Sequence, residues 1–270
     1  MAFLQVNFYS RALRRSTVFN ALIPLDRFEP TGEKSVPEQQ MKSLYLLHGY
    51  SGNHMDWVIN SNIQEYSLKY NVAVFMPSCE NFFYLDDTDM GALYSEYVGI
   101  ELVEFTRRIF PVSGKREDTF IGGLSMGGYG AIINGLKYSN TFSRIIALSS
   151  ALIIDKIAGI PVDFKDGIAD YNYYSRVFGD VNKVKGSDKD PEALVLQMKK
   201  ENKQIPEIFM ACGTEDFLLA ANRKLHDFLL AEGIEHTYIE SPGTHDWKFW
   251  NEYIEKGLEW ACKSHDSGII

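Results

Sequence analysis

The clearest candidate for chemistry in this 270-residue chain is a serine between glycines, in the sequence Gly-Leu-Ser-Met-Gly at residues 123–127. A G-x-S-x-G sequence exposes a nucleophilic serine when it forms a sharp turn between a buried strand and a helix. Both neighbours are present, because an apolar run ends at Leu124 and a helical pattern follows from residue 127. The motif therefore predicts that Ser125 is a nucleophile. The alternative is a glycine-rich turn in which the serine is incidental.

A serine hydroxyl becomes a useful nucleophile only when a base takes its proton and a carboxylate orients that base. Where the nucleophilic serine lies in such a strand–turn–helix motif, the three residues follow one another along the chain in the order serine, acid, histidine. The segment Cys-Gly-Thr-Glu-Asp at 212–216 and the segment Pro-Gly-Thr-His at 242–245 follow the last two predicted strands. We expect Asp216 to orient His245, and His245 to be the base. Glu215 is the alternative acid, but only one of the two neighbouring carboxylates can face the histidine.

The other histidines fit the role of base less well. His48 and His54 precede the serine, which departs from the expected order, although both could line the site. His226 lies beside the apolar stripe of a helical pattern and is expected to be solvated, His236 opens a predicted strand, and His265 lies in a polar tail outside the residues that the structure describes.

Two backbone N–H groups should hold the negative oxygen that forms when an acyl carbonyl is attacked. One is the N–H of Met126, directly after the serine. The other is expected in the loop Leu-His-Gly-Tyr-Ser-Gly at 47–52, with Tyr50 as the first candidate and Gly49 as the alternative.

Aromatic residues near these loops suggest the walls of a pocket. We expect Trp57, Tyr84 and Trp247 to line it, together with Phe82 and Phe83 next to Tyr84, because these rings lie close in sequence to the oxyanion loop, a strand end and the histidine. Packing in the core or at the surface is the alternative for each. A pocket bordered by rings suits short acyl groups or planar phenolic acids better than long fatty chains.

The elements that must position these residues alternate between strand and helix. Short runs that predict strands lie at 43–48, 71–76, 119–124, 144–148, 207–212 and 236–240, and most of them are apolar at consecutive positions, as is typical of parallel strands buried on both faces. Helical patterns lie between them, at 91–109, 127–138, 219–232 and 246–262. Two antiparallel strands in the first 25 residues should join one edge. The pattern predicts an α/β protein with a doubly wound, mostly parallel sheet of about eight strands and helices on both faces.

The interval 151–205 interrupts this alternation. It is irregular and rich in tyrosine and lysine until Asp-Pro-Glu at 190–192, which is typical of a helix start. We expect it to form a small cap insertion over the strand ends, within a single domain that covers 1–270. A connection without a role is the alternative.

Composition excludes several classes of function. The net charge of −9 disfavours nucleic acid and anionic membrane surfaces as partners. Three cysteines without a CxxC pattern argue against a disulfide framework and against a metal site. The most apolar stretch, 145–154, is half of the roughly 20 residues that a spanning helix needs. Without an apolar signal segment at the N-terminus, a cytoplasmic protein is expected. The oligomeric state stays open, a homo-oligomer included.

Four segments resemble the esterase D-like branch of the α/β-hydrolases, and within it the tributyrin-esterase type. They are Tyr-Leu-Leu-His-Gly-Tyr-Ser-Gly-Asn-His at 45–54, Gly-Gly-Leu-Ser-Met-Gly-Gly-Tyr-Gly-Ala at 122–131, Cys-Gly-Thr-Glu-Asp-Phe-Leu at 212–218 and Gly-Thr-His-Asp-Trp-Lys-Phe-Trp at 243–250. The resemblance implies the α/β-hydrolase fold, the same three catalytic residues and the same two oxyanion donors. It also implies a hydrolase without a metal or an organic cofactor.

We therefore expect a serine carboxylesterase that hydrolyses short-chain acyl esters, from acetyl to butyryl, or small aromatic carboxylic esters. The reaction should pass through an acyl-enzyme, with a small-molecule ester as the partner. An S-formylglutathione hydrolase and a feruloyl or acetylxylan esterase are the alternatives among enzymes. A catalytically silent binding module is the alternative outside them, but no member of the expected triad is missing.

Overall fold

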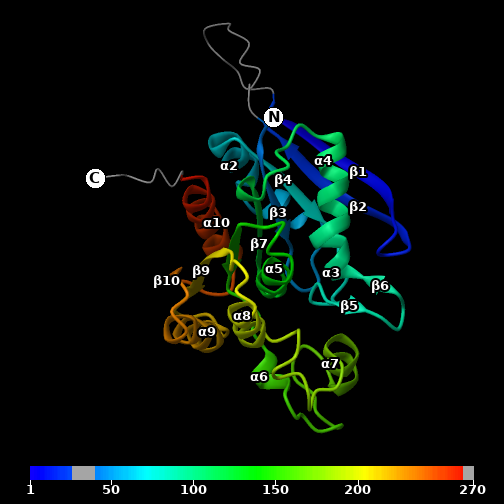
Figure 1. The fold of residues 1–270 in the computed structure, drawn as a ribbon, viewed down its shortest axis with the longest axis vertical. Helices are drawn as coiled ribbons and strands as arrows, with labels where there is room; N and C mark the ends of the chain where they lie inside the picture. Colours follow the sequence, from blue (N-terminus) through cyan, green and yellow to red (C-terminus); the bar gives the residue numbers. More distant parts are fainter. Residues whose placement is uncertain (26–39, 264–270) are drawn as a thin grey trace, which may run out of the picture.

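The computed structural model describes residues 1–25 and 40–263, and its main feature is an eight-stranded sheet (Figure 1). The strand order is β1-β2-β4-β3-β7-β8-β9-β10. The strands span Ala2–Ser10 (β1), Arg15–Ile23 (β2), Lys42–Leu47 (β3), Val72–Pro77 (β4), Thr119–Leu124 (β7), Arg144–Leu148 (β8), Glu207–Gly213 (β9) and His236–Ser241 (β10).

Strands β3, β4, β7, β8, β9 and β10 run parallel, whereas β1 and β2 form an antiparallel hairpin that joins the sheet through β4. The six predicted parallel strands and the two predicted antiparallel strands at one edge are therefore confirmed. Parallel strands all end at one edge of the sheet, so the loops after β3, β7, β9 and β10 can meet there.

Helices cover both faces of the sheet, as predicted. They include α2 (Ile63–Tyr70), α4 (Leu102–Ile109), α5 (Met126–Lys137), α9 (Leu219–Ala231) and α10 (Trp247–Cys262). Alternate residues of β3 face opposite cores: Tyr45 and Leu47 pack with α4, α5 and α9, whereas Leu44 and Leu46 pack with α2 and α10. Figure 1 shows α10 and α4 on opposite sides of the strands. A strand buried on both faces in this way must be apolar at every position, which is the pattern that predicted it.

The predicted helix at 91–109 is the least regular. Ala92–Leu93 form strand β6 and pair with β5 (Asp86–Asp87), and only then does the chain turn into α3 (Tyr94–Glu96). A π-helical turn at Tyr97–Glu101 leads into α4. The extra residue of that turn places the carboxylate of Glu101 where it accepts the N–H groups of Arg11 and Ala12 at the tip of the N-terminal hairpin. These contacts are distant in sequence, so local periodicity could not show them.

The interval 151–205 contains three helices, α6 (Ile154–Ile157), α7 (Tyr171–Phe178) and α8 (Pro191–Lys200). The helix start predicted at 190–192 is confirmed, because Asp190 caps α8 by accepting the N–H of Glu192 at 3.1 Å. Figure 1 shows α6 and α7 at one end of the molecule, away from α2 and α4. None of the helices in the described residues is long and apolar enough to cross a membrane.

Candidate active site

Ser125 lies in the sharp turn between β7 and α5, with φ 52° and ψ −116°. A positive φ is uncommon for any residue other than glycine, so the surrounding chain must hold this conformation in place. The two motif glycines allow it. A Cβ atom on Gly123 would lie 2.5 Å from the carbonyl oxygen of Gly127, and one on Gly127 would lie 2.5 Å from that of His48. Side chains at these positions would push helix α5 off the sheet.

The structure brings together the three residues that the sequence singled out. His245 Nε2 lies 3.0 Å from Ser125 Oγ, and His245 Nδ1 lies 2.8 Å from Asp216 Oδ2. These distances suit a Ser125 hydroxyl that donates to Nε2 and an Nδ1–H that donates to the carboxylate. The three side chains come from the loops after β7, β9 and β10, which meet at the same edge of the sheet.

Asp216 is buried, with a side chain that is 0% exposed in its pair with His245. Burial alone raises the pKa of this carboxyl group, but hydrogen bonds from His245, the Leu218 N–H and the Ser149 hydroxyl outweigh it and hold the pKa below its ordinary value. The Leu218 N–H donates to Oδ1 at 2.8 Å, which leaves Oδ2 to the histidine. Asp216 is therefore a carboxylate at neutral pH, aimed at Nδ1.

Glu215 connects two loops of the site and does not contact the histidine. Its Oε2 accepts the N–H of Gly243 at 2.6 Å, and its Oε1 accepts the hydroxyl of Thr214 at 2.8 Å. It thus ties the loop before Asp216 to the loop before His245, and its side chain is exposed. The expectation that only one of the two neighbouring carboxylates faces the histidine agrees with this geometry.

Two aromatic rings that sequence reasoning did not single out hold the imidazole. The Trp250 ring lies perpendicular to His245 at 4.9 Å between centroids, and the Phe217 ring lies at 4.6 Å. The indole N–H of Trp250 donates to Ser149 Oγ at 3.1 Å. Phe217 directly follows Asp216 and Trp250 opens the second turn of α10, so only the three-dimensional arrangement reveals their role.

The N–H groups of Tyr50 and Met126 are both without an acceptor among the residues that the structure describes. Met126 is the first residue of α5, where backbone N–H groups have no partner within the helix and the helix dipole favours negative charge. Both residues lie in the lining of the cavity at Ser125. They are thus available to an oxygen bound there.

His48 shapes the loop that carries Tyr50 and does not line the cavity. Its Nδ1–H donates to the carbonyl of Gly49 at 2.7 Å, and its Nε2 accepts the N–H of Cys79 at 3.0 Å. It is 1% exposed, and burial lowers its pKa, so it stays neutral. His54 faces Gln5 on β1 at 2.9 Å and is likewise outside the lining. Neither histidine lines the site, although the sequence left that open for both.

A cavity of about 160 Å³ opens at Ser125. Its lining is mostly apolar and consists of Tyr50, Phe83, Ser125, Met126, Ala151, Ile153, Lys156, Ile168, Tyr174, Phe217 and Leu218. Pockets for drug-sized ligands are about 300 Å³ or more, so this cavity suits a small group.

Trp57, Tyr84 and Trp247 do not line this cavity, which corrects the pocket expected from the sequence. Trp57 is buried, its indole N–H donates to the carbonyl of Leu47 at 3.0 Å, and its ring packs on Trp247. The hydroxyl of Tyr84 donates to the carbonyl of His48 at 2.8 Å. Of the rings expected at 82–84, Phe83 lines the cavity. Phe83 and Tyr84 both have a positive φ. Their side chains therefore do not point to opposite sides in the regular way that they would in an extended chain.

No cluster of three or more potential metal ligands occurs within residues 1–25 and 40–263. Cys79, Cys212 and Cys262 are free thiols, and burial raises the pKa of Cys212 to about 12. Apart from Ser125, the cavity lining carries the polar side-chain groups of Tyr50, Lys156 and Tyr174.

Comparison with known proteins identifies the family of this chain. Residues 28–261 match the family model described as "Putative esterase". The chain is 56% identical to the acetyl esterase of Caldicellulosiruptor saccharolyticus over 266 residues, which is 98% of this chain and 100% of that protein. A substrate-bound fluorophosphonate-binding serine hydrolase of Staphylococcus aureus superposes with a TM-score of 0.85 at 27% identity, over 97% of this chain and 99% of that one. The S-formylglutathione hydrolase of S. aureus gives a TM-score of 0.82, with the same identity and coverage.

Proposed function

This chain belongs to the esterase family and is a carboxylesterase with the α/β-hydrolase fold, and we propose that it hydrolyses acetyl and other short acyl esters through a covalent acyl-enzyme on Ser125. The observation that carries the proposal is the hydrogen-bonded series Ser125–His245–Asp216 at a cavity of about 160 Å³. The narrower assignment to the tributyrin-esterase type stays a prediction.

In the first half of the reaction Ser125 Oγ attacks the carbonyl carbon of the ester. His245 Nε2, 3.0 Å away, takes the hydroxyl proton as the new bond forms. The carbonyl oxygen becomes an anion, which the N–H groups of Met126 and Tyr50 stabilise. The tetrahedral intermediate then collapses, the alcohol oxygen takes the proton from His245, and the alcohol leaves.

In the second half His245 removes a proton from water, whose oxygen attacks the acyl carbon. The same two N–H groups hold the second oxyanion. When the intermediate collapses, Ser125 regains its proton from His245 and the carboxylic acid is released. Asp216 stays ionised throughout and stabilises the imidazolium that forms in each half. No step requires a cofactor.

Residues 151–205 act as the cap of this site. Five of the eleven lining residues belong to this segment: Ala151, Ile153, Lys156, Ile168 and Tyr174. Ala151 and Ile153 follow directly from β8, whereas Ile168 and Tyr174 return from the region of α7. These five residues form the cap wall of the cavity, in which Ile168 is 52% exposed.

The size and the lining favour a short acyl ester over S-formylglutathione. Among the described residues that line the cavity, Lys156 is the one cation, and it is already paired with Asp166 at 2.5 Å. The two carboxylates of a glutathione tail would find no further cation in that lining. The acetyl esterase that is 56% identical to this chain points the same way.

The cavity predicts a sharp dependence on acyl length. A p-nitrophenyl ester series should give the highest kcat/KM between acetyl and butyryl and at least a tenfold fall by decanoyl, about 1.4 kcal/mol of lost transition-state binding. In an open groove each added CH₂ would gain about 0.8 kcal/mol. In a closed cavity a chain that no longer fits meets rings such as Phe83, and such clashes cost more than a methylene gains.

The same assay should include methyl ferulate and S-formylglutathione. A rate that keeps rising to decanoyl would contradict the closed cavity, and a kcat/KM for S-formylglutathione above that for every oxyester would replace the proposed substrate class. Neither result would alter the expected role of Ser125.

A further inference from the structure

We propose that Asp166, which does not itself line the cavity, fixes the cap wall of that cavity and thereby sets the longest acyl chain that the enzyme accepts. This inference rests on the proposed function of the site at Ser125. It assigns a positioning role to a residue outside the triad and outside the oxyanion loop.

One carboxylate organises three of the eleven residues in the lining. Asp166 Oδ1 accepts the N–H groups of Ile168 and Ala169, both at 2.8 Å, which folds the loop so that Ile168 reaches the cavity. Its Oδ2 accepts the hydroxyl of Tyr174 at 2.9 Å and pairs with Lys156 Nζ at 2.5 Å. Lys156, Ile168 and Tyr174 all line the cavity.

The partners of Asp166 explain why its charge is stable there. Its side chain is 15% exposed, so the carboxylate has lost most of its water and needs other donors. Burial raises the pKa of Asp166, but the Lys156 ammonium, the two backbone N–H groups and the Tyr174 hydroxyl outweigh it and hold the pKa far below its usual range. Asp166 is therefore a carboxylate at neutral pH.

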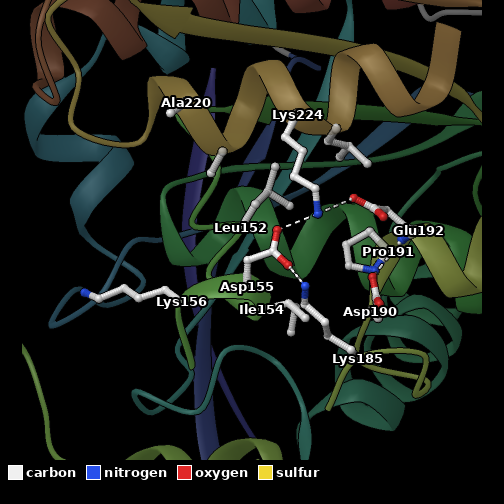
Figure 2. A pocket seen from close by; sticks show the side chains of 12 residues that line it. Leu152, Ile154, Asp155, Lys156, Lys185, Asp190, Pro191, Glu192, Ala220 and Lys224 are labelled. Carbon is white, nitrogen blue, oxygen red and sulfur yellow. Dashed lines mark hydrogen bonds and ion pairs between the residues drawn. The ribbon is translucent and has the colours of Figure 1, made fainter. Parts of the chain in front are cut away.

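Ion pairs on the opposite side of α6 keep Lys156 within reach of Asp166. Asp155, the preceding residue, pairs with Lys185 and with Lys224, the latter at 2.5 Å. Lys224 on α9 also pairs with Glu192 on α8 at 3.0 Å. Figure 2 shows these groups pointing toward one another, whereas Lys156 points away from them. The short helix α6 is thus held by charge from two sides.

These ion pairs border a second cavity, of about 340 Å³. The ammonium groups of Lys185 and Lys224 that face it are taken by Asp155 and Glu192, and Asp190 caps α8. The charged groups around this cavity therefore serve to hold α6 in place.

Loss of the Asp166 charge should open the wall. Without it the half-exposed Lys156 side chain loses the ion pair that holds it against the cap, and Tyr174 loses the acceptor that fixes its ring. The cavity then extends toward solvent between Lys156 and Tyr174. Acyl chains that clash with the intact wall can pass through that opening.

Asp166→Asn is the sharpest variant, because it keeps an oxygen for the N–H groups of Ile168 and Ala169 and replaces Oδ2 by an NH₂ group. That group cannot accept the Tyr174 hydroxyl and does not attract an ammonium ion. We expect the ratio of kcat/KM for the octanoyl ester to that for the butyryl ester to rise about tenfold, mostly through a lower KM for the octanoyl ester. Lys156→Met should raise the ratio similarly, and Tyr174→Phe by a smaller factor.

Asp180→Asn is the matched control. Asp180 is another cap aspartate, between α7 and α8; it accepts the N–H of Asn182 at 3.0 Å and pairs with Lys183 at 3.4 Å, but it is outside the lining. We expect this variant to leave the ratio and the butyryl rate unchanged. Salt provides a second readout, because about 1 M NaCl weakens an ion pair whose lysine side chain, that of Lys156, is half exposed. The wild-type ratio should rise with salt more than that of Lys156→Met.

An unchanged ratio in folded Asp166→Asn and in Lys156→Met would overturn the inference. If Asp166→Asn does not fold, Lys156→Met and the salt series decide alone. Both variants and the wild type should also be labelled by a fluorophosphonate. Labelling of Ser125 with an unchanged ratio rejects only the role of Asp166, whereas absence of label in the wild type rejects the proposed function itself.

Discussion

Replacing Ser125 by alanine is expected to lower kcat for acetyl and butyryl esters by about 10⁶-fold while the protein stays folded. The loss is large because Ser125 Oγ forms the covalent bond to the acyl group, and His245, 3.0 Å away, then has no proton to take. The oxyanion donors and the cavity remain, so a small acceleration over water should persist. Single-turnover and steady-state kinetics measure the loss, and urea unfolding checks the fold.

Ser150→Ala is the control for this substitution. Ser150 is another buried serine, just beyond the end of β8, and its Oγ has no hydrogen-bond partner among the described residues. Its loss should change kcat less than tenfold, because no contact to the triad is removed. Activity of Ser125→Ala above about one per cent of wild type would contradict the assignment of the nucleophile.

Asp216→Asn is expected to lower kcat roughly 10⁴-fold. The amide oxygen can still accept the Leu218 N–H, so the NH₂ group faces His245 Nδ1 at the position of Oδ2. That contact favours the tautomer with its proton on Nε2, which cannot accept the proton of Ser125. The mutant should fold, since the geometry of its loop is kept.

Glu215→Gln is the matched variant one residue away. A glutamine keeps an acceptor for the Gly243 N–H or the Thr214 hydroxyl, so the loop is weakened but the histidine keeps its tautomer. We expect less than a tenfold loss in kcat. If Glu215→Gln is the more severe of the two, the acid has been assigned to the wrong neighbour.

Most of the fold could be predicted from local sequence patterns. Runs that are apolar at every position have few other uses in a chain of this length than strands buried on both faces, and β3 shows why, since its successive residues enter two different cores. Ser125, Asp216 and His245 could be proposed because each sits in a short loop directly after a strand, where parallel topology brings the loops together.

The walls of the site could not be read in the same way. Trp57 and Phe83 are both aromatic and both follow strands, yet one donates its indole N–H to β3 and the other lines the cavity. The difference depends on a backbone turn with positive φ at residues 83–84. Such a turn cannot be predicted from the pattern of side chains. The role of Asp166 could not be predicted for a related reason, because its partners Lys156 and Tyr174 contact it only in the folded cap. The oligomeric state and the cytoplasmic location stay predictions.

The most direct test of the central claim is to identify the residue that a fluorophosphonate labels. Ser125 Oγ attacks phosphorus and fluoride leaves, as the ester alcohol would, but the phosphonate is not hydrolysed further. Digestion and mass spectrometry of the wild type should find one phosphonate per chain, on Ser125, and none on Ser125→Ala. Pre-incubation with excess butyryl ester should slow the labelling. A phosphonate on any other serine, or undiminished labelling of Ser125→Ala, would contradict the account.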